Sequence, residues 1–332
     1  MLPLPIFEHH KPKTLRAALE LLEKLGPSAV VIAGGTDLLP NMKQGLLAPE
    51  FVVSIAGIEE LSGVSLVNEP GGDKLVVGAG TKLAELESSI LVRRVAPALA
   101  EAAGQVGGPH HRAMGTLGGN ICLDTRCRYY NQTYFWRKSL GFCLKKDGTV
   151  CHVVRGGSKC VAAASNDTAP ALIALEAEIF VVGPKGERVV AASDFYVADG
   201  IKNTVLEPGE LVVRVAIPRK PTRRSAFEKL RRRSAIDFPL LSVAARVDVS
   251  PGEDDCIDAA DVVVSALGAR PRRVRAALKI CRGTPAANIA RELAESALAE
   301  CKPLPNVDDD TEWRRELVPV LVERALGRAI WG

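Results

Sequence analysis

Apolar positions along the chain recur first at helical and then at strand-like spacing. The first helix is expected to begin after Thr14, which can cap it, and to end at Gly26-Pro27. Its apolar positions form a single stripe: Leu15, Ala18, Leu19, Leu22 and Leu25. The uninterrupted apolar run at residues 29–33 then predicts a short buried strand, which leads directly into a glycine pair.

The same spacing predicts further elements as far as the C-terminus. Strands are expected at residues 51–55, 74–77, 177–182, 242–249 and 259–266. Helices are expected at residues 82–88, 96–105, 169–175, 287–301 and 311–326. A proline-rich and basic stretch, 218–222, predicts a boundary between a domain of residues 1–220 and a smaller α+β domain of residues 221–332.

Composition sets limits on the class of protein. A chain of 332 residues with 47% hydrophobic content can bury a large core. The net charge of +4 is too small and too scattered to favour nucleic acid as a partner. The first ten residues do not resemble a signal peptide, and no run of about 18 apolar residues predicts a membrane span. We therefore expect a cytoplasmic protein whose thiols stay reduced.

Two glycine pairs suggest a site for an anion. Gly34-Gly35 is followed by Thr36-Asp37, and Thr116 precedes Gly118-Gly119-Asn120. Adjacent glycines let backbone N–H groups converge on a phosphate, although such a pair often forms only a turn. Neither pair fits the Rossmann or Walker pattern, so a nucleotide would bind in another mode.

These two segments resemble the pyrophosphate loops of the FAD-binding medium subunits of the xanthine dehydrogenase and carbon monoxide dehydrogenase family, the molybdenum hydroxylases. The resemblance continues over nearly the whole chain, at residues 77–81, 167–172, 229–239, 268–271 and 313–315. It implies an FAD-binding domain of the vanillyl-alcohol-oxidase type followed by a smaller C-terminal domain.

The resemblance also implies which residues bind FAD. Residues 31–38 would wrap the diphosphate: Val31, Ile32, Ala33, Gly34, Gly35, Thr36, Asp37 and Leu38. Thr116, Gly118, Gly119 and Asn120 would form the second loop, and the backbone of Val106 would approach the cofactor. Asp167 would accept hydrogen bonds from FAD hydroxyls, and Lys229 would lie near the flavin. Read without the resemblance, Asp167 is a helix cap and Lys229 is a solvated charge.

A cysteine-rich segment separates the second glycine pair from Asp167. Five of the eight cysteines lie between Cys122 and Cys160, together with six of the fifteen aromatic residues. The segment carries eight basic and two acidic residues, a net charge of +6. Clustered thiols of this kind indicate a disulfide framework, a zinc site or an iron–sulfur cluster.

Ordinary members of the family have only a few residues at this place, so residues 122–164 are an insertion. Cys122 follows the second glycine pair and is expected to be a buried free thiol of the shared core. Four cysteines within the insertion are the expected metal ligands: Cys127, Cys143, Cys151 and Cys160. Their spacing includes no short Cys-x2–4-Cys pair, which disfavours zinc, and nearby cations would stabilise an anionic [4Fe–4S] cluster. His152 is an alternative ligand.

Within the family, a four-cysteine insertion resembles the β subunit of 4-hydroxybenzoyl-CoA reductase. This implies a subunit with FAD and a [4Fe–4S] cluster that takes electrons from ferredoxin. It would work with a [2Fe–2S] small subunit and with a molybdopterin-containing large subunit, and the catalysis would occur on the large subunit. The alternatives are a flavoprotein subunit that serves another aromatic or N-heterocyclic substrate, a self-sufficient flavin oxidase, and a zinc-stabilised interaction protein without catalytic activity.

Overall fold

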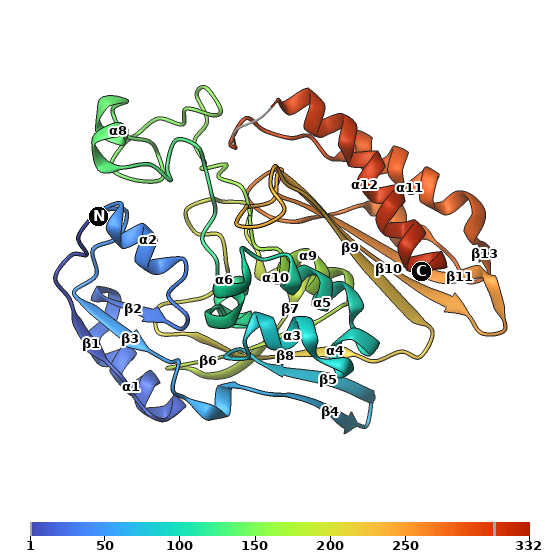
Figure 1. Ribbon diagram of the computed structural model, residues 1–332, viewed down its shortest axis with the longest axis horizontal. Helices are drawn as coiled ribbons and strands as arrows, with labels where there is room; N and C mark the ends of the chain where they lie inside the picture. Colours follow the sequence, from blue (N-terminus) through green and yellow to red (C-terminus); the bar gives the residue numbers. More distant parts are fainter. Residues whose placement is uncertain (1, 308–309) are drawn as a thin grey trace.

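The computed structural model describes residues 2–307 and 310–332 and contains three β-sheets with helices packed against them (Figure 1). A three-stranded parallel sheet has the order β1 (Glu8–His10), β3 (Phe51–Ser54), β2 (Ala29–Ile32). Helix α1 (Leu15–Leu25) packs on it, and Thr14 caps that helix by accepting a hydrogen bond from the Ala17 N–H.

The second sheet is antiparallel, with the strand order β4-β5-β8-β6-β7. Its strands are β4 (Val64–Glu69), β5 (Gly72–Gly78), β6 (Glu178–Gly183), β7 (Gly186–Ala191) and β8 (Leu211–Pro218). Short helices join these strands and supply about half of the largest apolar core: α3 (Leu83–Ser88), α4 (Ile90–Val95), α5 (Pro97–Gly104), α9 (Thr168–Ala174) and α10 (Ala192–Phe195).

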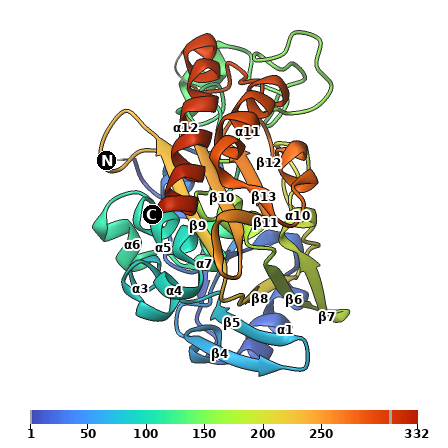
Figure 2. The same cartoon turned by 90° about the vertical axis from the view of Figure 1, so that its right-hand side faces the viewer.

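The third sheet lies in the C-terminal part of the chain. It contains β9 (Arg223–Leu230), β10 (Leu241–Ser250), β11 (Glu253–Ser265), β12 (Arg272–Arg273) and β13 (Thr284–Pro285). Helices α11 (Ala286–Glu300) and α12 (Thr311–Trp331) run side by side over it (Figure 2). Helices α5 and α9 also contact this sheet, so nine consecutive residues of β10 are buried, from Leu241 to Val249.

Three further helices surround the segments that contain the glycine pairs: α2 (Leu38–Lys43), α6 (Pro109–Met114) and α7 (Leu117–Ile121). They were not expected from the sequence. Each has only five or six residues, which is too short for an apolar period to show. The longer expected helices and strands are present, with ends that differ by a few residues.

The cysteine-rich insertion is mostly irregular and contains a single short helix, α8 (Tyr134–Ser139), among its residues, all of which are described. In Figure 1 it stands at one edge of the molecule, in green. Its two ends meet at Arg126 and Ala163, whose backbones exchange hydrogen bonds of 2.8 and 2.7 Å. The side chain of Arg137 is buried and donates to the Gly45 carbonyl, which fastens α8 to the end of α2. In the described part of the chain, no helix combines the length and apolarity that a membrane span requires.

Candidate functional site

A cavity of about 580 Å³ lies where the two glycine segments face each other. This volume is within the range of pockets that bind cofactors and other small molecules. All but one of the residues expected to bind FAD line the cavity, and Lys229 is the exception. Residues distant in sequence are therefore brought together as the resemblance implied.

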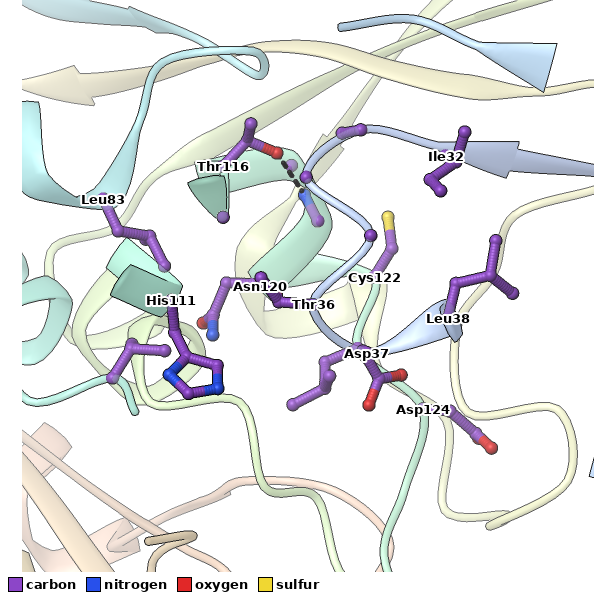
Figure 3. Close-up of a pocket in the computed structure, with 18 of the residues that line it drawn as sticks. Ile32, Thr36, Asp37, Leu38, Leu83, His111, Thr116, Asn120, Cys122 and Asp124 are labelled. Carbon is purple, nitrogen blue, oxygen red and sulfur yellow. Dashed lines mark hydrogen bonds between the residues drawn. The ribbon is translucent and has the colours of Figure 1, made fainter. Parts of the chain in front are cut away.

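The first glycine segment connects β2 to α2 and depends on both glycines. A Cβ atom on Gly34 would lie 2.1 Å from the carbonyl oxygen of Met114, so only glycine permits this approach to the neighbouring chain. Gly35 has a φ of +70°, a conformation that costs other L-residues energy. Figure 3 shows the segment turning so that Thr36 and Asp37 lie opposite Thr116 and Asn120.

Asp37 is neutralised within the protein. Its carboxylate forms an ion pair with Arg126 and accepts a hydrogen bond of 3.0 Å from Asn41 Nδ2. The Arg126 guanidinium also stacks on the ring of Phe238, 4.3 Å from its centroid. Burial lowers the pKa of Arg126 to about 10, so it remains protonated at neutral pH. Asp37 therefore does not oppose the binding of an anion.

The second glycine segment is a capped helical turn rather than the loop expected from the sequence. Thr116 Oγ1 accepts a hydrogen bond from the Gly119 N–H at 3.1 Å and caps α7 (Figure 3). Asn120 Oδ1 accepts from both the backbone N–H and the hydroxyl of Thr168, at 3.1 and 2.6 Å. The side-chain carbonyl of Asn120 thus joins α7 to α9, and Nδ2 of the same side chain can donate to a ligand.

Asp167 lies in the cavity wall and Lys229 lies behind it. Lys229 Nζ donates to Asp167 Oδ2 at 2.7 Å and to the carbonyls of Gln105 and Asp237. The Lys229 side chain is fully buried, so its interpretation as a solvated charge is wrong. Asp167 occupies the cap position of α9, but its side chain makes no capping hydrogen bond.

Asp167 brings an unpartnered hydrogen-bond acceptor to the cavity wall. Burial, only partly offset by Lys229, raises the pKa of Asp167 to about 6. Its Oδ1 is shielded from water and has no hydrogen-bond partner among the described residues. A hydroxyl of a ligand in the cavity would satisfy this atom. The open glycine backbones and this acceptor together fit FAD.

Several residues that line the cavity were not expected from the sequence. His111 projects from α6, and Ile236 and Phe238 come from the loop between β9 and β10. Ile236 has a φ of +55°, and its N–H donates to the Gly107 carbonyl. Only tertiary contacts bring these residues to the site. The sequence marks Phe238 solely by its place in a family motif.

Cys122 also differs from the expectation of a buried core thiol. It is exposed, but to the large cavity that it lines rather than to the outer surface. Desolvation by the surrounding protein raises the pKa of the Cys122 thiol to about 12, so the thiol is neutral at physiological pH. A cysteine and a histidine, Cys122 and His111, therefore line the expected flavin site.

The other four cysteines of the segment line a second, small cavity in the insertion: Cys127, Cys143, Cys151 and Cys160. Cys122 is not among its lining residues. In the described ranges, no three or more His, Cys, Asp or Glu side chains form a group that could hold a metal ion. Four thiolates around a cube of four irons each bind a different iron, so they are farther apart than the ligands of one zinc ion.

Burial raises the pKa of the Cys127 thiol to about 11 and also raises that of Cys160, while a few donors and one lysine lie beside the small cavity. The Val154 N–H donates to Cys151 Sγ at 3.4 Å, and Lys145 lies over the ring of Tyr130 with its Nζ bonded to Asp124. His152 Nε2 lies 2.6 Å from the Phe142 carbonyl oxygen, so that nitrogen carries a proton and donates it. This hydrogen bond leaves Nδ1 as the ring nitrogen through which His152 could act as an alternative ligand.

Comparison with known proteins agrees with this geometry. The profile of the FAD binding domain in molybdopterin dehydrogenase matches residues 5–220, and that of the CO dehydrogenase flavoprotein C-terminal domain matches residues 225–329. The chain belongs to this flavoprotein family. The expected fold class, α+β with a FAD-binding domain and a C-terminal domain, is confirmed, and the chain is an oxidoreductase subunit that binds FAD.

Three relatives show how far the similarity extends. The carbon monoxide dehydrogenase medium chain of Afipia carboxidovorans is 31% identical and covers 97% of this chain and 96% of its own. The aldehyde oxidoreductase FAD-binding subunit PaoB of Escherichia coli is 33% identical, with 66% of this chain and 70% of its own covered. A chain in the crystal structure of the Cu,Mo-CO dehydrogenase superposes with a TM-score of 0.78 at 28% identity, and 99% of each chain is covered.

These relatives support the broader expectation, a flavoprotein subunit that serves another substrate, better than the narrower one of 4-hydroxybenzoyl-CoA reductase. They also disfavour the zinc-stabilised interaction protein without catalytic activity, because both matched domains are domains of dehydrogenase flavoproteins.

Proposed function

We propose that this chain is the electron-transfer subunit of a molybdenum hydroxylase-type complex and carries both FAD and a [4Fe–4S] cluster. The observation that carries the proposal is the adjacency of the two sites. Arg126 lines the large cavity, and the next residue, Cys127, lines the four-cysteine cavity. Adjacent Cα atoms are about 3.8 Å apart, so the walls of the two cavities share consecutive residues of the chain at this point.

The residues of the chain have separable tasks in this proposal. Backbone N–H groups of the glycine segments bind the FAD diphosphate, and Asp167 Oδ1 accepts a hydrogen bond from a hydroxyl. Cys127, Cys143, Cys151 and Cys160 hold the cluster. When bound, FAD exchanges electrons singly or in pairs and the cluster exchanges them singly, so the pair links one-electron donors to two-electron chemistry. The protein fixes the positions of both.

The insertion supports a more specific assignment for the donor and the substrate. Its net charge of +6 suits an acidic ferredoxin, because long-range attraction speeds the docking of oppositely charged surfaces. The specific function would be reductive dehydroxylation of 4-hydroxybenzoyl-CoA on a molybdopterin-containing large subunit. A [2Fe–2S] small subunit would connect that subunit to this chain. The broader alternative is the oxidation of another aromatic or N-heterocyclic substrate by the same type of complex.

Iron content tests the cofactor assignment. Anaerobically purified chain should contain about four irons and stoichiometric FAD. Cys127→Ser should lose the iron and retain FAD, since Cys127 lies in the small cavity. The matched control, Cys122→Ser, should retain both, because Cys122 lies outside that cavity. Stoichiometric zinc without iron, or loss of iron from the control alone, would refute the assignment.

Turnover by the assembled complex tests the substrate. The complex with reduced ferredoxin should dehydroxylate 4-hydroxybenzoyl-CoA, whereas the isolated chain with an artificial donor should not. Oxidation of other aromatic substrates without this activity would select the broader alternative. Turnover of the thioester by the isolated chain would contradict the requirement for a partner subunit.

A further inference from the structure

A second large cavity, of about 490 Å³, is lined by residues that line neither of the two candidate cofactor sites. One wall comes from the FAD-binding part and contains Ile173, Ser193 and Tyr196. The opposite wall comes from the C-terminal part and contains the segment 270–275 with the end of α11 at Glu300 and Cys301. Clefts between domains are common places for small ligands.

Arginine dominates the lining of this cavity. Four arginines line it, Arg270, Arg272, Arg273 and Arg275, against one carboxylate, that of Glu300. Glu300 is itself engaged, because it accepts hydrogen bonds from the Arg275 backbone N–H at 3.2 and 3.3 Å. Arg275 also pairs with Glu300 at 4.0 Å and Arg273 with Asp261 at 2.8 Å, so the excess of positive charge in the cavity comes from Arg270 and Arg272. The C-terminal end of α11 opposes it weakly.

The outer arginines are available to a ligand. Arg270 and Arg272 are exposed, and neither side chain forms a hydrogen bond or an ion pair within residues 2–307 and 310–332. Neither arginine therefore stabilises the fold through an ion pair. Their guanidinium groups present planar sets of N–H donors that match the oxygens of phosphate.

The inner arginine is held in place by the protein and still has an unused donor. Arg273 Nη2 lies 2.8 Å from Asp261 Oδ2 and donates to the Ile173 carbonyl at 3.0 Å, which ties the two walls together. Its Nε is shielded from water and has no hydrogen-bond partner among the described residues. A buried donor without a partner is costly, and an anionic ligand in the cavity is one way to satisfy it.

We propose that this cavity binds a small molecule through its phosphate group. The arginines supply charge and bidentate donors, and the size of the cavity accommodates more than a bare anion. Ile173, Pro271 and Tyr196 provide apolar contacts for the remainder of a phosphate ester of nucleotide size. The inference does not rest on the assignment of the four cysteines.

Titration calorimetry on the full chain loaded with FAD tests the proposal, because saturation with FAD prevents the probes from binding in the flavin cavity. The probes are ADP and inorganic phosphate. ADP should bind with a stoichiometry of one, and added NaCl should weaken the binding because the contacts are ionic. The double variant Arg270→Ser/Arg272→Ser should weaken it about tenfold or more, since it removes two charge-assisted contacts.

Arg291→Ser is the control, because it makes the same type of substitution, with loss of one positive charge, at an exposed position on α11 outside the cavity. It should change the affinity less than about twofold, as expected for an exposed charge. Tighter binding of ADP than of phosphate would identify a phosphate ester as the ligand, and equal binding would identify the free anion. Absence of binding by both probes at millimolar concentration, or equal affinity in the double variant and the native chain, would overturn the proposal.

Discussion

Lys229 Nζ lies 2.7 Å from Asp167 Oδ2, and this buried ion pair joins β9 of the C-terminal sheet to the wall of the flavin cavity. The Lys229 side chain is fully buried and that of Asp167 is 4% exposed. Lys229 is therefore a positioning residue, which orients Asp167 toward the cavity without lining the cavity itself.

Loss of this pair should destabilise the protein. Lys229→Met leaves the Asp167 carboxylate buried without its cation, and removal of one partner from a buried pair costs about 3–5 kcal/mol. Urea unfolding should show a decrease of this size in the free energy of unfolding. Lys220→Met is the control, because Lys220 is half-exposed and its pairs contribute less than about 1 kcal/mol. Equal losses in the two variants would contradict the role of Lys229.

The affinity for FAD should depend on pH through Asp167. Its pKa is raised to about 6, so the carboxylate is ionised above this pH and protonated below it. An ionised carboxylate accepts a hydrogen bond from a hydroxyl more strongly than a neutral carboxyl group does. Affinity should therefore fall about fivefold as the pH is lowered from 7.5 to 5, measured by quenching of flavin fluorescence. Asp167→Asn should remove this dependence, and a rise in affinity at low pH would be the opposite of what we expect.

Gly35→Val should reduce FAD binding. Gly35 has a φ of +70°, and a Cβ atom there would lie 3.1 Å from Ile32 Cδ1 and 3.2 Å from Leu39 Cδ1. The left-handed conformation alone costs a side chain about 1–2 kcal/mol, so the segment should shift and the flavin content should fall by more than half. Gly72→Val shares a positive φ in the β4–β5 hairpin but has open space around it. This control should retain FAD; a variant at Gly35 that folds with full flavin content would disprove the loop assignment.

Arg137 should hold the insertion in place independently of FAD. Its side chain is 1% exposed, donates to the Gly45 carbonyl at 3.2 Å and lies beside the rings of Phe142 and Tyr134. Arg137→Met should therefore lower the iron content and speed tryptic cleavage within the insertion, while FAD stays bound. Lys138→Met changes the adjacent exposed position and should do neither. Loss of FAD together with iron would show that the two sites are not separable.

The sequence predicted those parts of the fold in which local pattern and tertiary packing agree. Helix α1 has a cap at Thr14, an apolar stripe and a terminating glycine, so its limits were expected within a residue. Strand β9 was missed, because Arg223, Glu228 and Lys229 interrupt its apolar pattern. These residues are buried or partly buried through partners outside the strand, such as Asp248 on the neighbouring strand β10 for Arg223.

In the candidate site too, the sequence predicts the residues that carry a local signal and misses those that depend on tertiary contacts. The glycine pairs are visible in the sequence because closely approaching backbones require glycine at Gly34 and Gly35. The pairing of Asp37 with Arg126 spans 89 positions and depends on how the insertion returns to the core. No local signal marks such a pair, nor does one mark the position of Cys122 in the cavity wall.

The backbone pair between Arg126 and Ala163 brings the two ends of the insertion together at one point of the core. A segment that leaves and re-enters a fold through neighbouring residues can be gained or lost without moving the elements on either side. The flavin-binding fold can thus accommodate the insertion as one unit, and the proposed iron–sulfur site would be gained or lost together with it. The same junction offers protein engineers a place to transplant the insertion into another flavoprotein of this fold.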